Sequence, residues 1–596
     1  MGQAIVNDYE EEAKKHSFSS FILKLPHIKF WPLLLLLIVI TSVYLCYLAF
    51  AIWQVVPNVD LYTPGETEEF IQDNFRIAND VVRLQWITWP IQVFMTLLVL
   101  LVAVLAIILY KKKKLTWKNG LLLVLAVAVI ITIGYGLYTD NITTRQYDVW
   151  GDNTYYGHYG ITMYIYKNGK IPMAYDGAGF YEIEESYQLY HPKLSYLCYA
   201  GFMHINSLFF GNNDWTIYQA NRILTITIMV MTLYFEYKIV QESNLSDKGK
   251  FIMGFVVLFC PVLFRMAAQS NNDPFVTLFM MMAIYFSIRW LKKHTFFNII
   301  MIALSIGLAM ASKLSGVTIA VLTAIIFIYV LIEIIIKKDI SIKLSSLIIQ
   351  FAVFAVIVFP LGLFWPLYNY VLYGQPLNYV FFSSFSFYST ESASIFDSIG
   401  YFSFKEYFEN PYIVTCMYNR MNYPINVNYY STVAKMFFYG EFGYTNTWCL
   451  FNDFANVAAW IINVIALLVF FVFVVASIYL VTKFIIIIVH QTKEHKKVII
   501  ANNFTYIMAI LFITFVVSSI AFIFKYPRLS SYDMRYYLPI ILPIGFIFAK
   551  AIEKFSLSKY KKASNVMGTS FILLMSSLAI AVTVFYVAIG TYAPIA

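Results

Sequence analysis

The chain has 596 residues, of which 60% are hydrophobic and only 13% are charged. Soluble proteins carry about 25% charged residues, so this composition excludes a string of soluble domains and indicates apolar helices dissolved in lipid. The net charge of +9 is not gathered into a basic domain, so we expect no nucleic-acid partner. The 5 cysteines do not make a disulfide framework, although a single disulfide between Cys416 and Cys449 stays open.

The apolar runs predict an all-α polytopic membrane protein, because each run approaches the roughly 20 residues that a spanning helix needs. The first run is too long for a cleavable signal peptide, and we interpret it as a retained span. The predicted spans number thirteen: 30–53, 91–110, 120–137, 215–237, 251–264, 274–291, 297–311, 315–335, 345–365, 454–485, 500–524, 536–551 and 570–589.

Clusters of basic residues orient these spans, because an excess of Lys and Arg marks cytoplasmic loops. All the clusters fall on one side of the cell membrane if the N-terminus is cytoplasmic, which puts the C-terminus outside. Two large loops, at about 138–214 and 366–453, are then external, and we expect short amphipathic helices in them. The clusters are Lys111–Lys114 with Lys118, Lys248 with Lys250, Lys292 with Lys293, Lys337 with Lys338, 493–497 and 559–562.

The first external loop opens with TRQYDVWGDNTYYGHYG and contains a candidate catalytic carboxylate, Asp148. Asp148 follows the third span by about ten residues, so it lies close to the outer surface. Its aromatic neighbours Tyr147 and Trp150 are able to raise its pKa and make it a general base. The alternative is an ordinary solvated loop aspartate.

The same loop offers further polar groups, Asp152, His158 and His191. Two aspartates and two histidines are able to hold a divalent metal ion, but their spacing matches no metal motif, so these residues stay open as metal ligands or acceptor contacts. The proline after His191 suits the start of a helix. Residues 155–167 predict an amphipathic helix on the membrane surface, with Tyr and Ile on one face.

The segment SNNDPFVTLF places Asp273 before Pro274 at the outer end of the sixth span. This pattern is typical of a helix N-cap. It is also typical of a site for a phosphate, since a helix N-terminus attracts anions. Asp273 is therefore a candidate second acidic residue.

Three cations approach the outer leaflet from different spans, and charges at membrane depth are costly enough to indicate function. Arg222 lies a few residues into the fourth span, Lys313 between the seventh and eighth, and Arg535 near the start of the twelfth. Together they suit a phosphate headgroup. Interfacial snorkelling, or a local pair between Arg535 and Asp533, is the alternative.

These segments together resemble the multi-spanning glycosyltransferases of the C-type superfamily, in particular the bacterial protein O-mannosyltransferase and aminoarabinose-transferase branch. The similar pieces cover roughly residues 120 to 550, occur in the expected order and agree with the predicted sidedness. They are QYDVWGDN…GHYGITMYIYKNGKIP, YHPKLSYL, NRILT, SNNDPFVTLFMMMAIYFSIRW, IGLAMASKLSG and DMRYYLPIILP.

The resemblance implies an enzyme that moves a sugar from a polyprenyl-phosphate carrier to an acceptor on the external face. It implies that residues 118–596 form the transferase core and residues 1–117 a cytoplasmic segment with two extra spans. It also implies that Asp148 is the catalytic carboxylate, Asp273 the second acidic site, and Arg222, Lys313 and Arg535 the residues that bind the donor phosphate.

The chain departs from the family pattern in places that bear on the acceptor. Lys193 replaces a proline in the segment HPKL, and the first loop has no adjacent Asp-Glu pair. The sugar and the acceptor, whether glycan, lipid or protein, therefore stay open.

The chemistry of a lipid-linked donor agrees with these assignments. The donor carries its own leaving group, a phosphate, whose developing charge nearby cations stabilise. One carboxylate that deprotonates the acceptor for attack from the opposite face inverts the anomeric carbon, and no Gly-rich nucleotide loop is needed. A transporter or flippase of lipid-linked sugars is the main alternative, and a non-catalytic assembly partner is the third.

Overall fold

The computed structural model describes residues 78–589 except 139–156, 173–190, 211–216, 219, 338–342, 374–376, 378–401, 403, 410–427, 440–452, 494–502, 526–528 and 557–560. The chain divides into two compact units, Met1–Val59 and Asp60–Ala596. The first unit, with the predicted span 30–53, lies outside the described residues. Every regular element in the described part is helical, which confirms the all-α prediction.

The long helices agree with the apolar runs. They are α5 (Ala78–Lys111), α6 (Trp117–Tyr138), α10 (Arg222–Glu242), α13 (Asp273–Lys292), α15 (Val317–Lys337), α16 (Leu344–Tyr373), α21 (Asp453–Lys493), α22 (Asn503–Lys525) and α24 (Lys561–Ile589). Within the described residues, 9 helices are long and apolar enough to cross a membrane. The protein is therefore a multi-pass membrane protein, although thirteen spans are not established.

The shorter elements include three of the predicted spans. They are α7 (Gly157–Asn168), α8 (Leu194–Phe210), α11 (Asp247–Leu258), α12 (Pro261–Met266), α14 (Phe296–Ser312), α18 (Phe404–Glu409), α19 (Tyr429–Tyr439) and α23 (Ile541–Ser556), with the 3₁₀ turns η4 (Leu314–Gly316), η6 (Leu529–Tyr532), η7 (Met534–Tyr536) and η8 (Leu538–Ile540). Of these, α14 is a 17-residue apolar helix that matches the predicted span 297–311.

The predicted continuous span 251–264 is wrong, because the helix breaks inside it. α11 ends at Leu258, and α12 starts at Pro261 after Cys260 adopts an extended conformation (φ −68°, ψ 118°). A residue before proline avoids the helical region, which explains the break. With 12 residues, α11 is only about 18 Å long. The predicted span 536–551 likewise begins in 3₁₀ turns, and regular helix starts only at Ile541.

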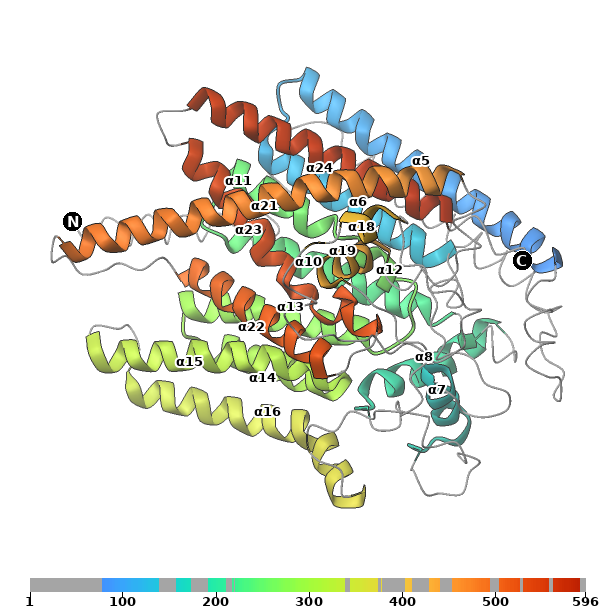
Figure 1. Ribbon diagram of the computed structural model, residues 1–596. Coiled ribbons are helices and arrows are strands. Elements are labelled where there is room, and N and C mark those ends of the chain that lie inside the picture. The colour runs from blue at the N-terminus through green and yellow to red at the C-terminus, as the bar shows by residue number, and fades with distance from the viewer. Residues whose placement is uncertain are drawn as a thin grey trace. The chain divides into compact units, whose positions relative to one another are not determined.

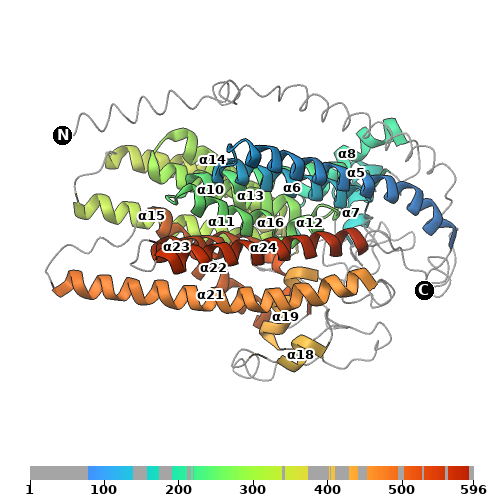
Figure 2. The ribbon, with the colours of Figure 1, turned by 90° about the horizontal axis from the view of Figure 1, so that it is seen from above.

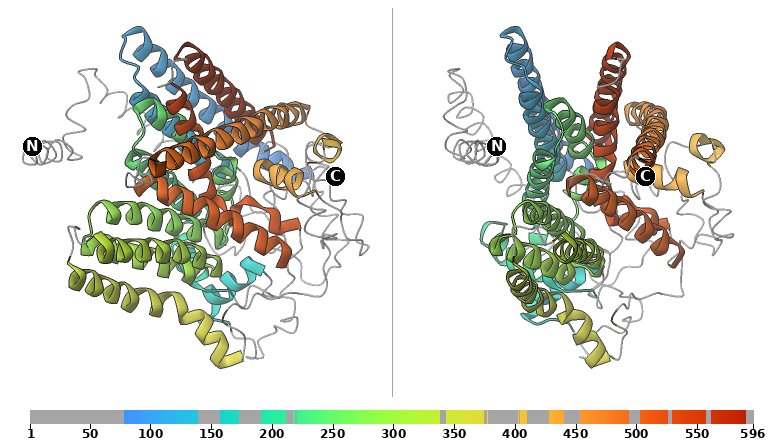
Figure 3. Two further views of the ribbon diagram at one scale, coloured as in Figure 1. Left: turned by 60° about the vertical axis from the view of Figure 1, so that its left-hand side comes forward. Right: turned by 90° about the vertical axis from the view of Figure 1, so that its left-hand side faces the viewer.

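Helix α13 lies at the centre of the helices that position the site. Of the most apolar 18 residues of this helix, 83% are buried, as expected for a helix that is hydrophobic all round. It packs against α10 on one side and α14 on another, and α14 packs in turn against α16 (Figure 1). The two views of Figure 3 show α14, α15 and α16 running side by side. Helix α21 packs on α23 and α24 (Figure 2).

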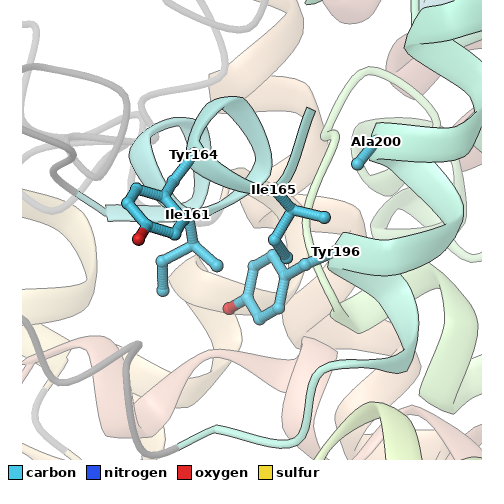
Figure 4. Close-up of a cluster of buried hydrophobic side chains, with 5 residues drawn as sticks. All are labelled: Ile161, Tyr164, Ile165, Tyr196 and Ala200. Carbon is cyan, nitrogen blue, oxygen red and sulfur yellow. The ribbon is translucent and has the colours of Figure 1, made fainter. Parts of the chain in front are cut away.

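The loop predicted to be external at about 138–214 contributes α7 and α8, which pack against each other. Figure 4 shows Ile161 and Ile165 of α7 beside Tyr196 of α8, and these side chains are buried. The predicted amphipathic helix is thus confirmed over Gly157–Asn168, and its Tyr and Ile face packs against α8. The apolar face is covered by α8, since protein side chains shield it from water as well as lipid would.

Candidate functional site

The site is built around Asp273, the first residue of α13, whose side chain is 2% exposed. Asn272, not Asp273, occupies the N-cap position, which corrects the predicted N-cap by one residue. The Asp273 backbone N–H donates to Asn271 Oδ1 at 2.9 Å. Because Asn271 satisfies this orphan donor of the first turn, the Asp273 carboxylate is available for contacts with other elements.

Two of the predicted cations converge on that carboxylate from separate elements. Lys313 is the extended residue between α14 and η4, and its Nζ donates to Asp273 Oδ1. Arg535 lies in η7, and its Nε is 3.5 Å from Asp273 Oδ2. The structure therefore brings together Asp273, Lys313 and Arg535, as the sequence predicted from their shared end of the spans.

The ring of Tyr536 holds both cations in place. Lys313 Nζ lies 4.4 Å from the ring centroid and Arg535 Cζ lies 5.0 Å from it. Arg535 Nη2 also donates to Tyr536 Oη at 3.1 Å. An aromatic face attracts cations through its quadrupole, so Tyr536 limits the repulsion between two positive charges that share one counterion.

Arg265 completes the cluster, and the sequence analysis missed it. This residue of α12 is 1% exposed, and its Nη2 lies 2.5 Å from Asp533 Oδ1. Asp533 Oδ2 lies 3.8 Å from Arg535 Nε, so the predicted local pair is present but is the longer of the two ion pairs of Asp533. The available signal was a charge directly after the apolar run 251–264, since a charge at membrane depth also made Arg222 a candidate.

These contacts connect five charged side chains in one cluster: Arg265, Asp533, Arg535, Asp273 and Lys313. Three cations face two carboxylates, which leaves an excess positive charge at the N-terminus of α13. The helix dipole adds further positive potential there. The arrangement can therefore bind an anionic group such as a phosphate.

His191 and His158, from the segments before α8 and at the start of α7, lie beside this cluster. His191 interacts electrostatically with Lys313 and Asp273, and desolvation together with the charges of Lys313, His158 and Lys193 lowers its pKa well below the usual value. His191 is thus neutral near pH 7 and able to accept or donate a hydrogen bond. His158 Nδ1 lies 2.7 Å from Tyr196 Oη.

Lys193 stands next to His191 and is 2% exposed. Its Nζ donates to the His191 carbonyl at 2.7 Å, and desolvation lowers the pKa of Lys193 from 10.5 to about 7. The departure from the family pattern at this position therefore places a buried lysine against the site.

The remaining predicted residues do not join these contacts in the described part of the chain. Arg222 begins α10, not a few residues inside a span, and its Nη1 donates to the Leu137 carbonyl of α6 at 3.4 Å. Asp148 and Asp152 lie outside the described residues, as do Cys416 and Cys449. Among the described residues, no group of three His, Cys, Asp or Glu side chains is placed to hold a metal ion.

Comparison with known proteins supports the predicted resemblance. Residues 190–365 match the family model described as dolichyl-phosphate-mannose-protein mannosyltransferase. The match confirms a similarity to membrane enzymes that use a lipid-phosphate-linked sugar, and it covers Arg222, Asp273 and Lys313. The search of curated proteins found no match.

Two solved structures are similar to this chain, both of ArnT from Cupriavidus metallidurans. One is bound to undecaprenyl phosphate and aligns with a TM-score of 0.40 and 12% identity. The other is the apo state, with a TM-score of 0.39 and 11% identity. Each alignment covers 80% of this chain and 76% of the other. Both TM-scores are below 0.5, so these two structures assign no role to residues of this chain.

Proposed function

We propose that this multi-pass membrane protein, which matches the mannosyltransferase family over residues 190–365, transfers a sugar from a polyprenyl-phosphate donor to an acceptor hydroxyl. One observation carries the proposal. Lys313 and Arg535 come from different elements and meet on Asp273 at the N-terminus of α13. A glycosyl phosphate needs such a cationic site, because its phosphate leaves as charge builds up on it.

In this proposal the donor phosphate binds next to Lys313 and Arg535. The guanidinium of Arg535 offers parallel N–H donors that fit phosphate oxygens, and the Lys313 ammonium adds a compact charge. The phosphate then shares these cations with Asp273, whose carboxylate holds them in position when no donor is bound. The cations stabilise the leaving group most strongly in the transition state, which is the condition for catalysis.

The general base in this proposal is Asp148. A carboxylate that accepts the proton of the acceptor hydroxyl allows attack on the anomeric carbon from the face opposite the phosphate. The bond from the anomeric carbon to the phosphate oxygen breaks as the new glycosidic bond forms, so the configuration inverts. His191 and His158 then border the acceptor side, and Asp152 is a nearby acceptor or metal contact. Arg222 remains a proposed outer contact for the donor phosphate.

The positions of the helix ends support the proposed external location of the reaction. Helix α13 runs from Asp273 to Lys292, and α15 runs from the turn after Lys313 to Lys337. The cluster thus occupies the ends opposite the lysines that mark cytoplasmic loops. This supports an N-terminus in the cytoplasm and an active site on the external face of the cell membrane.

The test separates a transferase from a flippase. We expect Asp148→Asn to abolish modification of the cell envelope, since a general base contributes about 10²–10⁴-fold, while purified protein still binds undecaprenyl phosphate. Mass analysis of envelope glycans and a carrier-binding assay measure the two effects. Asp152→Asn is the control, and equal loss in both variants, mimicked by chelator, would indicate a metal site. Full modification in Asp148→Asn would contradict the assignment and favour a flippase.

A further inference from the structure

Arg265 is a buried cation with no role in the chemistry above. It lies in α12, a helix of 6 residues, and its guanidinium is enclosed by two acceptors from distant parts of the chain. Nη2 pairs with Asp533 Oδ1 at 2.5 Å, and Nη1 donates to the Met436 carbonyl at 3.3 Å. Burying such a pair costs several kcal/mol in desolvation and often adds no net stability. Its presence beside a phosphate-binding cluster therefore suggests a role other than folding.

The first acceptor connects Arg265 to Arg535. Asp533 Oδ1 accepts from Arg265 and also from the backbone N–H of Arg535 at 3.0 Å. Asp533 Oδ2 faces the Arg535 side chain at 3.8 Å. With Arg265 in place, the charge of Asp533 is largely satisfied, and Arg535 extends to Asp273. Without Arg265, Asp533 would be a buried carboxylate that has lost its closest cation, and it would draw the side chain of Arg535 toward itself.

The second acceptor connects Arg265 to the second external loop. Met436 lies in α19, where its side chain packs against Ile523 and Tyr532. Helix α19 contacts α12, η6 and η7, so the loop helix rests directly on the segment that carries Arg535. The guanidinium of Arg265 is bonded at the same time to this helix and to Asp533.

We propose that Arg265 is a positioning residue: it holds Asp533 so that Arg535 points at the donor phosphate, and it couples the docking of α19 to that geometry. This inference rests on the proposed function, because it takes the phosphate site to be at Lys313 and Arg535. It concerns binding of the phosphate, a property that a purely structural ion pair would not control.

The central variant is the double substitution Arg265→Met with Asp533→Asn. It removes both charges, so no unpaired charge is left buried, and the Asn side-chain oxygen still accepts from the Arg535 N–H. We expect a melting temperature within about 3 °C of wild type. We also expect affinity for undecaprenyl phosphate in nanodiscs to fall by about tenfold, because Arg535 loses its fixed orientation.

Further variants keep the proposal testable if the double substitution does not fold. Arg265→Lys keeps a positive charge next to Asp533. A lysine lacks the planar guanidinium, so it cannot bond Asp533 and the Met436 carbonyl with the geometry of Arg. It should weaken carrier binding by a few fold and expose Lys435 of α19, which is 6% exposed, to trypsin. Arg289→Gln is the matched control, since Arg289 is a half-exposed cation paired with Glu242 at 3.2 Å at the other end of the helices.

The outcomes distinguish this inference from the proposed function. Wild-type carrier affinity in a folded double variant, or wild-type affinity and trypsin resistance in Arg265→Lys, overturns the positioning role. Unchanged affinity in Arg535→Ala overturns the phosphate site itself. Weak binding in Arg535→Ala and in the double variant, with Arg289→Gln like wild type, supports both.

Discussion

Asp273 and Lys313, which are 40 residues apart in the sequence, pair where α13 begins and α14 ends. The two helices form an antiparallel hairpin whose connection carries Lys292 and Lys293 at the opposite end. The Asp273–Lys313 ion pair therefore links the two helices at the open end of the hairpin. Lys313 is also one of the cations that we propose bind the donor phosphate.

Removing one partner of this pair should destabilise the protein more than removing both. Lys313→Met removes one of the two cations that face the buried Asp273 carboxylate, and breaking a fully buried pair costs about 3–5 kcal/mol. The cost here is smaller, because the Lys313 side chain is 12% exposed and Arg535 remains nearby. We expect Lys313→Met combined with Asp273→Asn to melt at a higher temperature than Lys313→Met alone in detergent. A double variant that is less stable than either single variant would contradict this.

Tyr536 should matter for its ring more than for its hydroxyl. Tyr536→Phe keeps the aromatic face next to Lys313 and Arg535, so carrier affinity should stay within about threefold of wild type. Tyr536→Leu removes a cation–π attraction of about 0.5–2 kcal/mol per cation, so it should weaken carrier binding roughly tenfold. Titration of purified variants with undecaprenyl phosphate measures both. Equal affinities in the two variants would remove the ring from the site.

Arg535 should tolerate lysine poorly. Arg535→Lys keeps the charge but loses the planar set of donors that we propose bonds the phosphate together with the Tyr536 hydroxyl. Its affinity for the carrier should therefore exceed that of Arg535→Ala but stay roughly tenfold below wild type. The salt dependence of binding provides a second readout, since a screened point charge is more sensitive to ionic strength. Wild-type affinity in Arg535→Lys would mean that carrier binding depends only on the positive charge at this position.

Lys193 should make stability depend on pH in a defined direction. Its pKa is about 7 in the folded protein and near 10.5 when unfolded, so between these values the unfolded chain binds more protons and stability rises with pH. The destabilising term is largest below pH 7 and disappears above the unfolded pKa. Lys193→Met should therefore raise the melting temperature at about pH 7 and show a smaller gain at about pH 9.5.

The control for this effect is Lys170→Met, because Lys170 is an exposed lysine that follows α7, the helix packed against α8. This variant should follow the wild-type melting curve at both pH values. A gain in Lys193→Met that does not change with pH would show that the lysine acts through packing, not through its titration.

The topology makes a prediction that needs no substrate. In a background without other cysteines, Lys112→Cys should react with an impermeant thiol reagent only after the cells are opened, because Lys112 lies in a basic loop. Lys170→Cys, exposed after α7, should react in intact cells. Reaction of Lys112→Cys in intact cells would reverse the orientation proposed for the site.

The sequence alone determined the long apolar helices and the helix ends at which the polar residues gather. The predicted span 274–291 differs from α13 by one residue at each end, because a buried apolar helix ends where its hydrophobic run ends. The positions of Asp273, Lys313 and Arg535 at the ends of runs predicted their common depth. Depth follows from sequence in a membrane protein, since the cost of burial in lipid depends on position along the helix.

Only the tertiary structure decided which of these residues meet. Arg222 shares the predicted depth but bonds the end of α6, whereas Arg265, missed from the sequence, pairs with Asp533 across 268 residues. The amphipathic pattern of α7 likewise did not reveal whether lipid or α8 covers its apolar face. Which residues of different helices meet depends on how the helices pack around one another. The hydrophobic pattern separates only polar from apolar surface, so it carries little information about which helix packs against which.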